Sequence, residues 1–159
     1  MNKGLIIAGL SVLSTLPNGE IDLLNIYGNA PIYYNAFCSL SIAKQNVLAK
    51  LDLLQNLDED WDGYGAPKIS IAAINNCRTI INQLPLDIVQ NVHVLPSEFG
   101  GVQMEIEKDN DIVNCDFGDK TFSYYVERKN AKTEYYSFLD YTEQNELKLI
   151  SDFSLMRDV

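Results

Sequence analysis

Acidic and aromatic residues are concentrated in one short segment, and here the sequence comes nearest to a defined chemistry. Asp60, Trp61, Asp62 and Tyr64 lie within the run D-E-D-W-D-G-Y-G-A-P at residues 58–67. Paired carboxylates act as acid and base in glycoside hydrolysis. One interpretation is therefore a ligand patch of a small-molecule or glycan-binding enzyme. The structural alternative is a compact connector between two helices, with its aromatic rings folded onto the body of the protein.

The same segment begins like a calcium-binding loop. Asp58, Asp60, Asp62 and Gly63 match the opening D-x-D-x-D-G of such a loop. Position twelve, where a bidentate glutamate is expected, is Ile69. Because only half of the ligand set is present, the sequence predicts no metal and no cofactor here.

Nucleophilic catalysis would have to use His93, the only histidine in the chain. It lies in a predicted strand, where a structural role is more common, although Cys115 could lie on a neighbouring strand. The chain has no G-x-S-x-G, no phosphate-binding glycine loop with lysine and no dinucleotide fingerprint. We therefore expect no catalytic residues and favour a protein that is not an enzyme.

The three cysteines, Cys38, Cys77 and Cys115, form no C-x-x-C pair. Such an odd, sparse set argues against a disulfide scaffold and is typical of buried thiols in a reducing compartment. The sequence therefore predicts a cytoplasmic protein.

The formal net charge of −10 comes entirely from residues 58–159, because residues 1–57 carry three lysines against three acidic residues. A chain this acidic repels phosphates, which excludes general nucleic-acid binding. The acidic residues are dense at 105–119. Tyrosines in two neighbouring predicted strands are typical of cross-strand aromatic pairing, and also of interfaces. The alternative explanation is that these acidic residues form a solvated surface that keeps the protein soluble. The expected interaction residues are Glu105, Glu107, Asp109, Asp111, Asp116, Asp119, Tyr125 and Tyr136.

Two helices precede these strands. Apolar residues recur every three or four positions over 36–57, which predicts the first helix. The second begins after Ser70, a favoured N-cap, and ends before Pro85. Apolar residues then alternate with polar ones in short runs separated by Asx and Gly turns, which predicts an antiparallel meander over 92–139. Thr142 is a candidate N-cap of a terminal helix.

The predicted fold class is α+β: two antiparallel helices packed on a four- to five-stranded antiparallel meander, with a possible C-terminal helix and an N-terminal arm. Residues 36–159 form the expected single domain. Residues 1–35 form a hairpin, a short helix or an arm, because the turn Pro17–Asn18–Gly19 separates two apolar runs. The first apolar run is too short to span a bilayer, so we expect no membrane segment. A homo-oligomer could form through this arm.

The loop W-D-G-Y-G-A-P at 61–67, the helix that ends at Pro85, and Pro96 followed by Gly100–Gly101 resemble a loose group of uncharacterised small bacterial proteins that share a W-D-G-Y-G-A loop. The resemblance covers roughly residues 54–107. The resemblance implies a bacterial, cytoplasmic setting and a mobile-element context. The group has no assigned activity, so it transfers no catalytic residues.

The sequence thus favours a non-catalytic, acidic protein-interaction module that docks a basic protein partner, as an antitoxin, an immunity protein or an inhibitor would. The first alternative is the enzyme that uses the loop at 58–67. The second is a structural component of a phage or mobile-element assembly, with residues 1–35 as its assembly arm.

Overall fold

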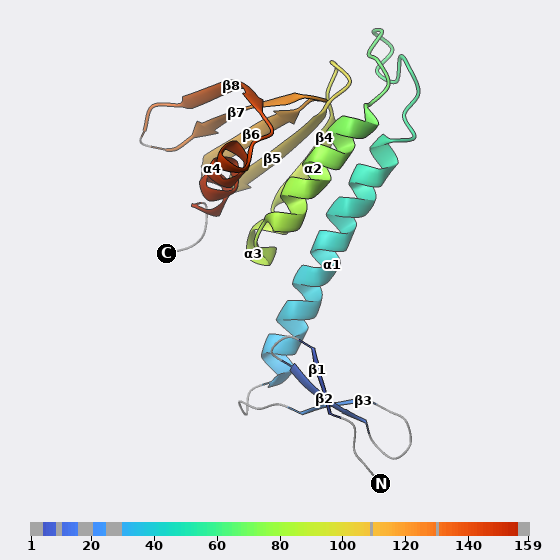
Figure 1. Ribbon diagram of the computed structural model, residues 1–159, viewed down its shortest axis with the longest axis vertical. Helices are drawn as coiled ribbons and strands as arrows, with labels where there is room; N and C mark the ends of the chain where they lie inside the picture. The colour runs from blue at the N-terminus through green and yellow to red at the C-terminus, as the bar shows by residue number, and fades with distance from the viewer. Residues whose placement is uncertain are drawn as a thin grey trace. The chain divides into compact units, whose positions relative to one another are not determined.

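The chain divides into two units, Met1–Ser39 and Leu40–Val159, and each is described by itself in this computed structural model (Figure 1). The backbone is described for residues 5–8, 11–15, 21–24, 30–108, 110–129 and 131–155, and the side chains from residue 40 onward within these ranges. Within them, no helix is both long enough and apolar enough to cross a membrane.

Three short strands form an antiparallel sheet in the first unit, in the order β1-β2-β3. Their runs of Ile, Leu and Val favour extended backbone. The bounds are Leu5–Ala8 for β1, Ser11–Thr15 for β2 and Ile21–Leu24 for β3. The turn predicted at Pro17–Asn18–Gly19 lies outside the described residues, between β2 and β3.

Four helices follow. The first predicted helix is confirmed, but it begins earlier, at Ala30, and ends at Leu54. Ser70 caps the second helix as predicted, because its hydroxyl accepts a hydrogen bond from the Ala72 amide at 3.2 Å. Thr142 caps the terminal helix through the Asn145 amide. The bounds are Ala30–Leu54 for α1, Ile71–Gln83 for α2, Leu86–Val89 for α3 and Glu143–Ser154 for α4.

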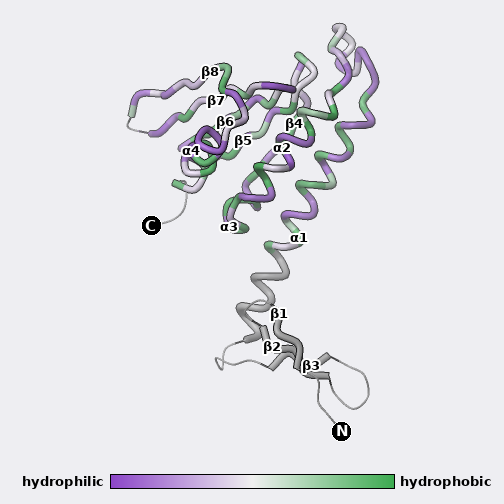
Figure 2. The backbone as a smooth tube through the Cα atoms, viewed as in Figure 1, coloured by the Kyte–Doolittle hydropathy of each residue, from purple (hydrophilic) through white to green (hydrophobic). Residues whose placement is uncertain are grey.

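Helices α1 and α2 run antiparallel, side by side (Figure 1). Arg78 of α2 donates to Asp52 of α1 at 2.6 Å, and the Lys44 ammonium donates to the carbonyl of Asn82 at 3.0 Å. Figure 2 shows apolar and polar residues alternating along α2, as expected for a helix with one buried face. The buried side chains of α2 are Ala73, Ile74, Cys77, Ile80 and Ile81.

The meander is confirmed as a five-stranded antiparallel sheet in the order β4-β5-β6-β7-β8. Every strand pairs with its neighbour in sequence, because short Asx and Gly turns suffice to reverse the chain. The bounds are Val92–Pro96 for β4, Val102–Lys108 for β5, Asp111–Phe117 for β6, Thr121–Glu127 for β7 and Glu134–Asp140 for β8.

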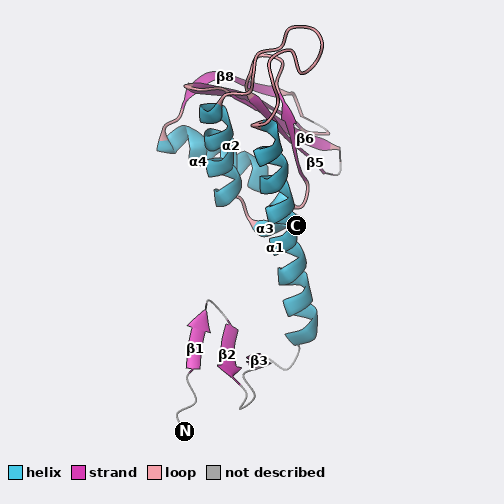
Figure 3. Ribbon diagram, turned by 90° about the vertical axis from the view of Figure 1, so that its right-hand side faces the viewer, coloured by secondary structure: helices cyan, strands magenta, loops and turns pink. Residues whose placement is uncertain are grey.

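The core lies between one face of this sheet and the helices. Every second residue along the strands, such as Met104, Cys115 and Phe122, points toward the helices and is buried in the same core as Leu149 and Phe153 of α4. Cys77 and Cys115 are buried free thiols, as predicted, and burial raises the pKa of both. Figure 3 shows α2 and α4 on the same side of the sheet. The second unit therefore has the predicted α+β architecture, and its helices leave the opposite face of the sheet uncovered.

Candidate functional site

The sheet face that points away from the helices is called the open face here. Its residues follow from the strand alternation and the register, because each strand places every second side chain on this side. One row crosses all five strands through directly paired positions: His93, Glu105, Asn114, Tyr125 and Tyr135. A second row runs beside it through Leu95, Gln103, Asp116 and Ser123. The open face is thus polar and aromatic, whereas the helix-facing side is apolar.

The charge of the open face has one sign. Strands β4 to β8 contain a single cationic residue, Lys108, and the alternation places it on the helix-facing side. Carboxylates on the open face come from four of the five strands. They are Glu105, Glu107, Asp116, Glu127 and Asp140. Because no lysine or arginine lies between them in these strands, their potentials add over the face.

A ladder of side-chain hydrogen bonds orders the centre of the open face. The Gln103 amide donates to Asn114 Oδ1 at 3.1 Å, and the Asn114 amide donates to the Glu105 carboxylate at 2.9 Å. Asn114 is 7% exposed, so its orientation is set by both partners. The ladder therefore holds the Glu105 carboxylate in a defined position on the face.

A shallow depression of about 170 Å³ opens on this face between β6, β7 and β8. The Tyr125 and Tyr135 rings lie beside it with their centroids 6.0 Å apart. Burial raises the pKa of Tyr125, and the nearby Glu105 and Glu127 raise it further. The residues that line the depression are Asn114, Asp116, Ser123, Tyr124, Tyr125, Tyr135, Tyr136 and Ser137.

A bulge in β8 shapes the rim of the depression. Phe122 pairs with Leu139 and Tyr124 with Tyr136, so Ser123 alone faces two residues of β8. Phe138, at a φ of 54°, donates its amide to the Ser123 hydroxyl at 2.9 Å. Phe138 is 81% exposed. The bulge thus turns an aromatic side chain outward at the sheet edge.

The structure divides the interaction residues that the sequence predicts. Glu105, Glu107, Asp116 and Tyr125 lie on the open face. Asp111 lies at the start of β6, where it accepts the Lys129 amide at 3.0 Å. Asp119 lies in the turn after β6, and its carbonyl accepts the Asn76 amide. Tyr136 is on the helix-facing side, and Asp109 lies outside the described residues. Segment 105–119 is therefore not one acidic surface.

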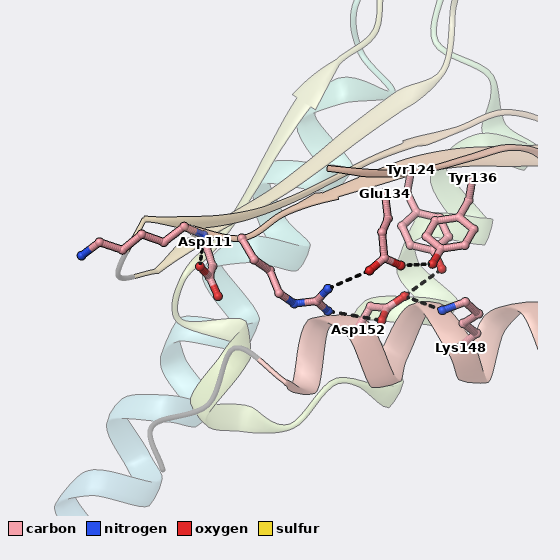
Figure 4. Close-up of polar contacts among 8 residues, drawn as sticks. Asp111, Tyr124, Glu134, Tyr136, Lys148 and Asp152 are labelled. Carbon is pink, nitrogen blue, oxygen red and sulfur yellow. Dashed lines mark hydrogen bonds and ion pairs between the residues drawn. The ribbon is translucent and has the colours of Figure 1, made fainter. Parts of the chain in front are cut away.

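A second polar cluster, which was not predicted from the sequence, joins the helix-facing side to α4 (Figure 4). Asp152 of α4 accepts the Tyr124 hydroxyl at 2.9 Å and the Lys148 ammonium at 3.2 Å, and it lies 3.6 Å from the Arg128 guanidinium. Burial raises the pKa of Tyr124, and its bond to Asp152 raises it further. A signal was present in the sequence, because Asp152 lies between apolar residues on the face of α4 that must be buried.

The rest of this cluster lies on β8. Arg128 also reaches Glu134 at 3.3 Å, and the Tyr136 hydroxyl donates to the other oxygen of that carboxylate. The Tyr124 and Tyr136 rings stack at 4.4 Å, and the Lys148 ammonium lies 4.6 Å from the Tyr136 centroid. With two cations and two carboxylates, the cluster is balanced in charge, which suits a clamp between α4 and the last two strands.

The loop at 58–67 is closed by its own aspartates. Asp60 Oδ1 accepts the Gly65 amide at 2.7 Å, and Asp62 Oδ1 accepts the amides of Tyr64 at 2.8 Å and Ala66 at 3.1 Å. Their carboxylates therefore cap backbone groups. Among the side chains that the structure describes, no three acidic, histidine or cysteine residues gather as a metal site would require.

The two aromatic residues of this loop differ in their surroundings. Trp61 packs against the core, as expected for a pinned connector. The expectation that Tyr64 folds onto the body of the protein was wrong, since this residue is 94% exposed. Gly63 and Gly65, on either side of Tyr64, both have a positive φ, a backbone conformation that glycine adopts without steric cost.

The candidate dyad of His93 and Cys115 does not form. His93 is exposed on the open face opposite Glu105, whereas Cys115 is buried on the helix-facing side. The sheet lies between the two side chains, so neither can activate the other.

Protonation of Asp62 is expected to loosen this loop at low pH. The Tyr64 and Ala66 amides hold the pKa of Asp62 below its ordinary 3.8. A carboxyl with a lowered pKa in the folded state contributes stability above its unfolded pKa, and the contribution disappears as pH falls through the folded value. Asp62→Ala should therefore lower the melting temperature at pH 7, and the difference from wild type should shrink below pH 3.8. Thermal unfolding from pH 7 to pH 2 measures this.

Asp58→Ala is the control for this experiment. Its carboxylate is 96% exposed, and its ion pair with the Lys68 ammonium is long at 4.0 Å. Because such exposed pairs contribute little to stability, removal of this carboxylate should leave the melting temperature unchanged. An Asp62→Ala deficit that stays constant down to pH 2 would contradict the assignment of the carboxylate as the cap.

No protein-family model, curated protein or solved structure matches this chain.

Proposed function

We propose that this protein is a non-catalytic interaction module that docks a basic protein partner on the open face of its sheet. The observation that carries the proposal is the segregation of charge: five carboxylates share this face, and the strands place no lysine or arginine on it. Complementary potential steers a partner to such a face and fixes its register. Exposed tyrosines beside the carboxylates supply the contact area that interfaces favour.

The proposal extends to the kind of partner. A protein that handles nucleic acid carries a basic surface for phosphates. An acidic face that covers this surface would block it, which is how an antitoxin, an immunity protein or an inhibitor would act. The proposal includes a bacterial, cytoplasmic setting. Its cytoplasmic part is supported by the buried free thiols of Cys77 and Cys115, which suit a reducing compartment.

The arrangement of the face also favours docking over catalysis. Its one histidine, His93, pairs across strands with Glu105, but Glu105 is held by Asn114 in the hydrogen-bond ladder. A base positioned by a carboxylate would need a nucleophile within reach. The Cys115 thiol lies buried on the other side of the sheet, so it cannot serve as the nucleophile for His93.

The test compares two triple variants of equal net charge as baits for proteins of the native lysate. The face variant carries Glu105→Gln, Glu107→Gln and Glu127→Gln. The control variant carries Glu59→Gln, Glu143→Gln and Glu146→Gln, which lie in the loop and in α4. Each removes three negative charges, and glutamine keeps an acceptor for Asn114. Captures are made at roughly 50 and 150 mM salt, because the higher concentration screens non-specific attraction between exposed charges more strongly than it weakens docking at a buried interface.

A protein retained by the wild type and by the control variant, and lost from the face variant, is the expected result. Retention by all three baits would place the interaction elsewhere on the chain. Equal loss from both variants would show that net charge matters and the open face does not, which would overturn the proposal.

A further inference from the structure

We infer that the depression on the open face receives one arginine side chain of the basic partner, so that recognition depends on a guanidinium and not on positive charge alone. This inference rests on the proposed function, whose site it makes specific. It concerns the part of the open face where β6, β7 and β8 meet.

The size of the depression sets the kind of occupant. Sites for metabolites and drug-sized ligands enclose about 300–1,000 Å³. This depression measures about 170 Å³ and opens widely to solvent. It is too small for such a ligand but suits the end of a single side chain. A protrusion from a partner therefore fits it better than a free small molecule.

The electrostatic surroundings favour a cation. Asp116 lines the depression, and Glu105 and Glu127 lie close enough to raise the pKa of Tyr125 beside it. No lysine or arginine of the chain is among the lining residues. An anionic or apolar side chain would leave these carboxylates without compensation, whereas a cation would pair with them.

The shape and chemistry of the walls favour arginine over lysine. The Tyr125 and Tyr135 rings offer π faces 6.0 Å apart, at an angle of 41°. A guanidinium is flat and stacks on such rings, and it carries five N–H donors in one plane. Acceptors line the same depression, namely the Asp116 carboxylate and the Ser123 and Ser137 hydroxyls. A lysine ammonium is a strongly hydrated point charge that uses this set less well.

Three peptides serve as probes: acetyl-(Gly-Arg)₄-amide, acetyl-(Gly-Lys)₄-amide and acetyl-(Gly-Gln)₄-amide. NMR titrations of the full chain give affinities and locate binding through the Asn114 side-chain amide. We expect the arginine peptide to bind about fivefold more tightly than the lysine peptide, a factor typical of an exposed cation–π contact. The glutamine peptide should bind least.

Variants locate the effect. Tyr135 is 74% exposed on the edge strand, so its replacement should leave the fold intact. Tyr135→Leu should reduce arginine binding to the lysine level, whereas Tyr135→Phe, which keeps the π face, should preserve the preference. Asp116→Asn should weaken arginine binding too. Tyr64→Leu, an exposed tyrosine outside the depression, is the matched control and should change nothing.

The outcomes separate this inference from the proposed function. Equal binding of both cationic peptides, weakened by the face variant, would leave docking in place and overturn arginine selection. An arginine preference that survives Tyr135→Leu and Asp116→Asn would overturn its assignment to the depression. If neither cationic peptide binds more tightly than the glutamine peptide, both the docking proposal and this inference fail.

Discussion

Asp152→Ala should lower the free energy of unfolding by about 3 kcal/mol, because breaking a buried ion pair leaves its partners uncompensated. The Asp152 side chain is 9% exposed and meets Tyr124, Lys148 and Arg128. Tyr124 is 3% exposed, so without Asp152 its hydroxyl would be buried with no hydrogen-bond partner. Urea-induced unfolding followed by circular dichroism measures the change.

The magnitude lies at the low end of the range of about 3–5 kcal/mol for broken buried pairs. The side chains of Arg128 and Lys148 are 30% and 48% exposed, so both regain water when the carboxylate is removed. Arg128 also keeps Glu134 as a partner. Most of the loss therefore comes from the orphaned Tyr124 hydroxyl, and the two cations contribute less than fully buried partners would.

A double-mutant cycle checks this explanation. Tyr124→Phe should cost about 1 kcal/mol, the usual worth of one hydrogen bond. The double variant should lose less than the sum of the two single losses, because both changes remove the same bond. Gln144→Ala, at an exposed position of α4, should stay within about 0.5 kcal/mol of wild type. Additive losses, or a loss at Asp152 no larger than at Gln144, would show that the cluster is not a clamp.

The clamp connects stability to the open face. Tyr124 and Tyr136 are directly paired across β7 and β8, and Tyr125 and Tyr135 are the next pair in the same two strands. The first pair is fixed against α4 and the second lies beside the depression. Because adjacent strand residues point to opposite faces, anchoring one pair also sets the position of the other. Asp152→Ala should therefore also weaken any binding in the depression.

The fold was predictable because its elements are marked by local signals. Alternation such as Val102, Met104 and Ile106 against acidic neighbours identified a half-buried strand, and the structure buries those three residues. Ser70 and Thr142 marked two helix starts through short-range capping. These signals are carried by neighbouring residues, so they can be read without knowledge of the tertiary structure. The short helix α3 was missed, since one turn after Pro85 leaves no periodicity to detect.

The site was predictable only in part because it depends on register. Acidic residues at 105–119 were recognised, but alternation and pairing send Glu105 and Asp116 to the open face and leave Asp111 and Asp119 at strand ends. Spacing in the sequence does not show that His93 and Tyr135, 42 residues apart, end the same cross-strand row. The Asp152 cluster joins three elements in the same way. Non-local pairing, not residue type, decides which of these side chains meet.

The loop at 61–67 and the glycine pair Gly100–Gly101, two motif segments noted in the sequence, meet in space. The Ser70 amide, just after the loop, donates to the Gly100 carbonyl at 2.9 Å, and a Cβ on Gly100 would lie 3.1 Å from Pro67 Cγ. A Cβ on Gly101 would lie only 2.5 Å from the backbone oxygen of Phe117. The glycine pair thus permits close backbone approach on two sides, one at the loop and one at β6.

Gly101→Ala should therefore destabilise the protein by about 2–3 kcal/mol, the cost of forcing an extra methyl into a packed site. The obstacle is a backbone carbonyl in the central strand β6, which cannot rotate away as a flexible side chain would. The same Cβ would lie 3.3 Å from Asp116 Oδ1, a buried oxygen that accepts no hydrogen bond. The Asp116 carboxylate should thus shift, and binding in the depression should weaken along with stability. Urea unfolding and the arginine-peptide titration measure the two effects.

Gly63 supplies the contrast that separates steric from conformational causes. It has a φ of 74°, and a Cβ there would meet nothing within 4 Å. Gly63→Ala should cost about 1–2 kcal/mol through backbone strain alone, and Gly63→Asn less, because asparagine tolerates the left-handed region. At Gly101, asparagine should be no better than alanine, since its Cβ meets the same carbonyl. Rescue of Gly101 by asparagine, or a loss at Gly63 as large as that at Gly101, would contradict close approach to Phe117 as the reason for glycine.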